Sequence, residues 1–164
     1  MDTSTFTHFS RAGFSHILSA LAPELVVFVP REVEIEIDKA REHHVNVPPL
    51  HEVPWVSRIF MTEDEQWTAT KVKVALGGGI EEHQGESAVI ACAHHRDLVA
   101  VLDDRAAVEQ TKRFEVQSID TMIIVAEAHK TIFEGNRDQT IALIDALLDT
   151  DMRLPVKSGA ELFG

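Results

Sequence analysis

The fold is decided by residues 85–107, which read GESAVIACAHHRDLVAVLDDRAA. Small and apolar residues over 88–93 predict a helix that begins near Glu86. The run over 98–102 is wholly apolar, which is typical of a parallel strand buried on both faces. Two aspartates end this strand, and another helix is expected over 106–113. Helix, strand, acidic turn and helix in so short a stretch indicate an α/β protein.

The same alternation continues on both sides of this stretch. Further helices are expected over residues 6–21, 62–76, 121–133 and 137–148, and short strands over 25–29 and 116–119. Residues 31–42 fit a strand by their alternation or a helix by their apolar spacing, and Pro30 favours the helix because proline suits a first helical turn. Short strands separated by helices imply a parallel sheet covered on both faces. We predict one domain over residues 1–164, with an atypical, proline-containing excursion at about 43–80.

The composition limits the class of protein. The chain has 15 Lys+Arg and 27 Asp+Glu, for a formal net charge of −12. This balance argues against binding nucleic acid through a broad basic face, but it is compatible with an acidic metal pocket. The single cysteine, Cys92, excludes an internal disulfide and a cysteine-rich zinc module. No apolar run reaches the roughly 20 residues of a membrane span and no signal peptide is evident, so we expect a cytoplasmic protein without a membrane partner.

Several acidic residues lie at the expected junctions between helices and strands. Asp103 and Asp104 end a parallel strand, which is where ligands bind in α/β sheets. Glu36 follows the other apolar strand within two helical turns, Glu86 begins a helix, and Asp2 opens the chain. Hard divalent cations such as Mg²⁺ prefer oxygen ligands, so convergence of these residues would create a metal site beside a phosphate group.

The order of these motifs resembles the PIN domain family, and within it the compact prokaryotic branch akin to VapC-type toxins. The matching segments are Asp2-Thr3-Ser4, Val29-Pro30 through Glu36-Ile37, Gly85-Glu86 through Ile90-Ala91, and Leu98 through Ala107. The resemblance covers nearly the whole chain and is weakest at about 43–80. It implies a PIN-like three-layer α/β/α sandwich with a short parallel sheet flanked by helices.

The resemblance also implies a metal-dependent endoribonuclease and a homodimer. The VapC-type branch adds the expectation of a toxin that is restrained by an antitoxin protein. By this analogy, the ligands of one or two Mg²⁺ or Mn²⁺ ions are Asp2, Glu36, Glu86 and Asp104, with Asp103 as the alternative to Asp104. Hydrogen bonds from Thr3 or Ser4 would support the cluster. The metal would lower the pKa of a bound water, and the resulting hydroxide would attack the phosphodiester of an RNA substrate.

Two features depart from the family pattern. The family has a buried strand before its first aspartate, whereas only Met1 precedes Asp2 here; either the chain starts further upstream or this strand is shortened. The branch usually has glycine before the threonine at 121, whereas this chain has Asp120. Asp120 could add a carboxylate beside Thr121 or cap the following helix, and its residue type favours the cap.

Other residues leave alternatives open. Trp55 and Trp67 could stack RNA bases, although packing of an added helix is favoured. The pairs His43-His44 and His94-His95 could bind metal, although surface positions are favoured because adjacent residues do not share a helix face. The main basic concentration consists of Arg105, Lys112, Arg113 and Lys130, which either steer RNA or form ordinary helix surface. The alternative function is a catalytically weak or inactive PIN-fold protein that binds protein or RNA.

Overall fold

The computed structural model describes residues 1–164 and confirms the α/β class. Its helices are α1 (Thr3–Arg11), α2 (His16–Leu21), α3 (Arg31–Arg41), α4 (Glu63–Leu76), α5 (Gln84–Arg96), α6 (Arg105–Arg113), α7 (Thr121–Thr131) and α8 (Arg137–Leu148). Its strands are β1 (Val27–Pro30), β2 (Val56–Ile59), β3 (Ala100–Val101) and β4 (Ser118–Ile119). Short 3₁₀ turns are η1 (Pro23–Leu25), η2 (Leu50–Glu52) and η3 (Gly159–Phe163). None of the helices combines the length and apolar character needed to cross a bilayer.

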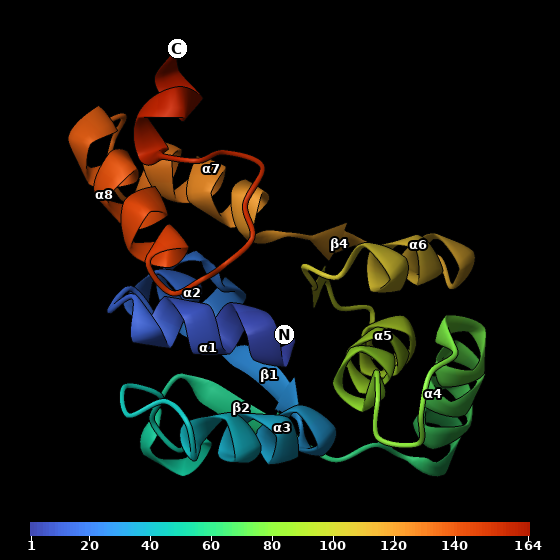
Figure 1. Ribbon diagram of the computed structural model, residues 1–164. Coiled ribbons are helices and arrows are strands. Elements are labelled where there is room, and N and C mark those ends of the chain that lie inside the picture. The colour runs from blue at the N-terminus through green and yellow to red at the C-terminus, as the bar shows by residue number, and fades with distance from the viewer.

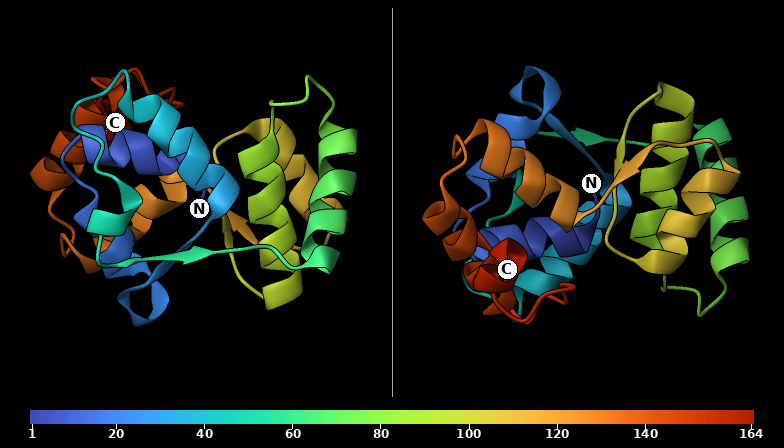
Figure 2. Two further views of the ribbon diagram at one scale, coloured as in Figure 1. Left: turned by 90° about the horizontal axis from the view of Figure 1, so that it is seen from below. Right: turned by 90° about the horizontal axis from the view of Figure 1, so that it is seen from above.

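The strands form two parallel pairs, β1 with β2 and β3 with β4. Residues 1–2 lie between the pairs, because the Met1 nitrogen donates to the Phe28 carbonyl at 3.1 Å and the Asp2 nitrogen donates to the Val101 carbonyl at 3.1 Å. The N-terminus accordingly lies in the middle of the molecule in both views of Figure 2. This arrangement places Asp2 at the centre of the strand layer.

The helices cover the strands on two sides, which gives the PIN-like α/β/α arrangement. Helices α4, α5 and α6 lie on one side, and α1, α2, α7 and α8 lie on the other (Figures 1 and 2). Helix α3 packs against both α1 and α5. The largest fully buried side chains come from both sides and include Phe6, Phe9, Ile90, Leu102, Leu143 and Leu147. One hydrophobic core therefore runs through the strand layer.

The structure corrects two of the predicted elements near the N-terminus. The single helix expected over 6–21 is wrong, because the chain breaks between α1 and α2 at Gly13, whose φ of +78° leaves the helical region. The strand expected over 25–29 begins later, at Val27. Leu25 instead lies in η1 with a φ of +60° and is 63% exposed. The ambiguous segment 31–42 is a helix, as Pro30 indicated.

Residues 43–80 contain more regular structure than their prolines suggested. Strand β2 was not predicted, and it pairs with β1 directly after Pro54 and Trp55. Helix α4 was predicted, and its start is fixed by a capping box between Thr62 and Glu65. Helix α4 ends at Gly77 and packs closely along α5.

Candidate active site

Asp2 is a buried carboxylate at the N-terminus of α1, with 4% of its surface exposed. Its Oδ1 accepts a hydrogen bond from the Thr5 nitrogen at 2.9 Å, and its Oδ2 accepts one from the Asp103 nitrogen at 3.2 Å. Burial raises the pKa of Asp2 to about 6, and the negative charge of Asp103 adds to this rise against the effect of the hydrogen bonds. A cation beside this carboxylate would oppose the same rise.

Glu36 reaches from α3 to the first turn of α5. Its Oε1 accepts from the Gly85 nitrogen at 2.9 Å, and its Oε2 accepts from the hydroxyl of Thr3. A Cβ atom at position 85 would collide with the Glu36 carboxylate, so only glycine permits this approach. The structure thus brings the Asp2-Thr3-Ser4 segment, Glu36 and the Gly85-Glu86 segment to one place.

Glu86 is half-buried and its carboxylate accepts no hydrogen bond. The nearest cationic partner is the His83 ring, whose Nδ1 lies 3.8 Å from Oε1. Burial raises the pKa of Glu86, and the negative charges of Glu36 and Asp104 raise it further. Glu86 therefore lies close enough to two other carboxylates to be affected by their charge, and we call Glu36, Glu86 and Asp104 the acidic trio.

The two aspartates that end β3 have different surroundings. Asp103 accepts three hydrogen bonds, from the Thr5 hydroxyl at 3.0 Å and from both the nitrogen and the hydroxyl of Thr121 at 2.8 Å. Asp104 is exposed and caps α6, since its Oδ1 accepts from the Ala107 nitrogen at 2.8 Å. Asp103 ties the end of β3 to α1 and α7, whereas Asp104 belongs to the acidic trio and acts on the charge of Glu86.

The residues predicted to support the carboxylates differ in the hydrogen bonds that they make. Asp120 is exposed and its Oδ1 accepts from the Ile123 nitrogen at 2.9 Å, which confirms that it is the N-cap of α7. Thr121 is buried and binds Asp103 rather than any member of the acidic trio. Ser4 makes no hydrogen bond to the carboxylates, so Thr3 is the member of this pair that contacts them.

Glu32 is a further carboxylate, which the sequence motifs did not single out. It lies one turn before Glu36, and its Oε2 is buried without a hydrogen-bond partner. The hydroxyl of Ser87, next to Glu86, is also buried without a partner. The i, i+4 spacing of Glu32 and Glu36 was the available signal, because residues four apart share one face of a helix.

The chemistry of these side chains fits a divalent cation. They are oxygen donors, two of them are desolvated, and the negative charge of the acidic trio has no positive partner nearby other than His83. No three carboxylate, imidazole or thiolate groups are arranged as ligands of one ion in the structure. The structure therefore describes neighbouring charges that a cation would stabilise, and it does not describe a formed coordination shell.

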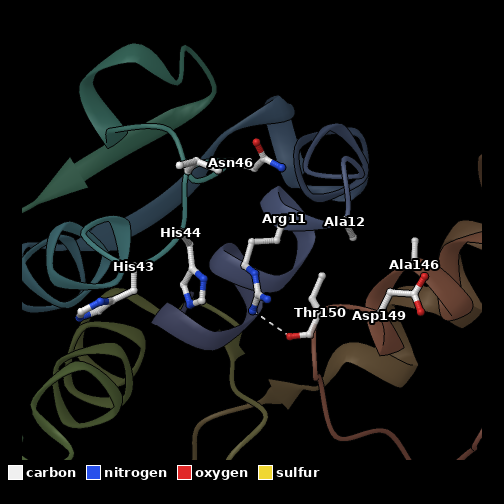
Figure 3. A pocket seen from close by; sticks show the side chains of 9 residues that line it. Arg11, Ala12, His43, His44, Asn46, Ala146, Asp149 and Thr150 are labelled. Atoms are coloured by element: carbon white, nitrogen blue, oxygen red, sulfur yellow. Dashed lines mark hydrogen bonds between the residues drawn. The ribbon is translucent and has the colours of Figure 1, made fainter.

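The paired histidines lie apart from the carboxylates. His43 and His44 line an open hollow of about 470 Å³ beside Arg11, whose Nη1 donates to the Thr150 carbonyl at 2.8 Å (Figure 3). The residues of this hollow include none of the predicted ligands. His94 and His95 contact the Phe114 carbonyl and the Thr68 hydroxyl on separate sides of α5.

The two tryptophans also differ. Trp55 is half-buried and packs on Phe6, with ring centroids 6.1 Å apart, as the packing interpretation required. The same interpretation is wrong for Trp67, which is 64% exposed. Cys92 is buried, and burial raises its pKa to about 11.

The fold and the acidic residues together agree with the comparison by family. The family model DUF3368, a PIN domain, matches residues 1–162. The chain therefore belongs to the PIN domain family, whose members are generally nucleases and typically use divalent metal ions. Comparison with curated proteins and with solved structures gave no match.

Proposed function

We propose that the protein is a metal-dependent endoribonuclease that hydrolyses RNA phosphodiester bonds with Mg²⁺ or Mn²⁺. The observation that carries the proposal is the acidic trio, whose charges raise the pKa of Glu86 at the meeting point of α3, α5 and α6. Carboxylates without cationic partners cost free energy, and a bound cation would offset that cost. RNA as the substrate rests on the resemblance to the toxin-like branch of the family.

The residues have separate roles in this proposal. Glu86 would hold the metal together with Asp104, whose Oδ1 also accepts from the Ala107 nitrogen, and Asp2 would supply a further carboxylate. Glu36 is oriented by Thr3 and Gly85 before any ion binds. Asp103 is a positioning residue, because its hydrogen bonds hold Thr5 and Thr121 around the end of β3. The ion, when bound, would activate a water and stabilise the leaving oxygen.

The wider biological features belong to the same proposal. A toxin role with an antitoxin partner, a homodimer and a cytoplasmic location all rest on the resemblance to the VapC-type branch. A single domain over residues 1–164 is likewise proposed. An acidic pocket would suit an inhibitor that inserts a basic side chain, since that side chain would take the place of the metal.

Cleavage of a single-stranded RNA in the presence of Mn²⁺ tests the proposal. We expect the Glu86→Gln and Asp104→Asn proteins to lose activity on the order of 100-fold or more, because each removes a ligand charge. Asp120→Asn is the matched control, since it also changes a capping aspartate to asparagine but lies outside the acidic trio. Cleavage at the wild-type rate by the Glu86→Gln protein would refute the assignment.

The second candidate function is a binding module with an unused site. The observation in its favour is that no three side chains are arranged as ligands of one ion. A calorimetric titration with Mn²⁺ of the wild-type and Asp104→Asn proteins separates the two candidates. The nuclease proposal expects binding that weakens in the variant, whereas no binding by either protein would favour the module.

A further inference from the structure

We propose that the groove between α4 and α6 binds single-stranded RNA, with a base stacked on Trp67 and phosphates at Lys71 and Arg113. The inference rests on the proposed RNA substrate and adds a binding site that lies outside the acidic trio. Helices α4 and α6 lie side by side in Figures 1 and 2.

Trp67 has the surroundings of a stacking platform. Its side chain is 64% exposed, whereas Phe6 and Phe9 are fully buried. Lys71 lies one turn further along α4, with its Nζ 5.7 Å from the centre of the indole ring. Aromatic rings bind bases of any sequence because every base has a π face, and a nearby cation binds the backbone of the same strand.

The groove itself continues from this ring. It has a volume of about 610 Å³, and its apolar surface comes from Val74, Ala75 and Phe114. Arg113 lies at its edge, beside Phe114 at the end of α6.

The positive charge of the groove favours a negatively charged ligand. Lys71 and Arg113 line the groove and no carboxylate does, although the whole chain carries a formal charge of −12. Both cations are exposed and neither forms an ion pair with a carboxylate of the chain. A groove that combines an aromatic face with free cations matches the bases and phosphates of a single strand. A second copy of this acidic chain would bring like charge to the same surface.

The groove also lies close to the proposed catalytic centre. Asp104 caps the N-terminus of α6 and Arg113 lies in its last turn. A helix of this length spans about 14 Å at roughly 1.5 Å per residue. The groove and the acidic trio therefore lie near opposite ends of one helix, within the reach of a few nucleotides.

Intrinsic fluorescence tests the inference without requiring catalysis. The Trp55→Phe protein leaves Trp67 as its only tryptophan, and it would be titrated with an eight-nucleotide oligouridylate in EDTA, where no metal supports cleavage. We expect quenching of the Trp67 emission at saturation. If the RNA binds in EDTA but is never cleaved with Mn²⁺, the groove stands and the proposed nuclease fails, so the two outcomes are distinguishable.

Variants then assign the contacts. We expect Trp67→Ala to weaken RNA binding roughly tenfold or more, and Lys71→Gln and Arg113→Gln each to reduce the salt dependence of binding by about one counterion. Lys157→Gln, an exposed lysine outside the groove, is the charge-matched control. Saturating RNA that leaves Trp67 emission unchanged would overturn the inference. So would emission that responds only to protein concentration, because this would mark the groove as a self-association surface.

Discussion

The neighbouring carboxylates of Asp103 and Asp104 differ in what each holds in place. Asp103 accepts hydrogen bonds from Thr5 and Thr121, which come from helices on the same side of the strands. Asp104 accepts one hydrogen bond at the start of α6. Under the proposed function, Asp103 has a structural role and Asp104 a metal-binding one.

This difference predicts that two matched substitutions change different properties of the protein, one its stability and the other its activity. Asp103→Asn should lower the free energy of unfolding by about 1–3 kcal/mol, because an amide nitrogen replaces one acceptor of a partly buried network. Asp104→Asn should leave stability nearly unchanged, since asparagine also caps helices well, and should remove RNA cleavage. Urea unfolding and a cleavage assay on both proteins measure this. Equal losses of stability would contradict it.

Gly85 provides a second prediction at a single residue. In Gly85→Ala the added Cβ would displace the Glu36 carboxylate from the N-terminus of α5. We expect weaker Mn²⁺ binding and RNA cleavage reduced about 10- to 100-fold, as for other residues that orient a ligand. Gly79→Ala is the control, because a Cβ there makes only ordinary contacts with Glu82. The same loss in both variants would show that the effect does not depend on Glu36.

At the level of elements, α4 is attached to α5 by an ion pair between the buried Glu65 and the exposed Arg96. Glu65 is 2% exposed, and both of its oxygens accept from Arg96, at 2.6 and 2.8 Å. Arg96 also donates to the Phe60 carbonyl at 2.9 Å. The hydrogen bonds from Arg96 lower the pKa of Glu65 from its ordinary 4.5 to about 2.

The lowered pKa fixes the direction of a pH effect. Stability from the Glu65 charge is fully present above pH 4.5 and is lost as the pH falls through about 2. Glu65→Gln keeps the capping geometry and should cost about 1–3 kcal/mol at pH 7, because solvent around the exposed Arg96 side chain screens the pair. The difference from wild type in urea unfolding should shrink at pH 3. Glu109→Gln, which breaks an exposed pair with Lys112, should have little effect at either pH.

The helices and strands also show which structural features can be predicted from the sequence. Helices α3, α4 and α8 were predicted closely, because proline, capping residues and apolar spacing act locally. Strand β2 was missed because its pairing with β1 depends on distant residues and because the prolines just before it indicated a loop. The candidate ligands were found from motifs at element junctions. The hydrogen bonds that Asp103 accepts from Thr5 and Thr121 could not be predicted from the sequence, because these residues lie 98 and 18 positions away.

For the whole molecule, the charge of −12 should control how fast RNA arrives. At low salt the acidic surface repels an approaching RNA over long distances. At 0.1 M salt the screening length falls to about 10 Å, so this repulsion becomes weaker. We expect the association rate constant to stay flat or to rise between about 20 and 150 mM NaCl. Stopped-flow anisotropy of labelled RNA in EDTA measures this rate. A steep fall with salt would indicate basic steering instead.

The position of residues 1–2 between β1 and β3 also has a consequence for synthesis of the chain. The carboxylate of Asp2 accepts from a residue 101 positions later, so the strand layer cannot close around it until that residue has left the ribosome. At roughly 5–20 residues per second this delay is on the order of 5–20 s. Under the proposed function, a nascent chain would therefore have no ribonuclease activity until Asp103 had been made and had left the ribosome.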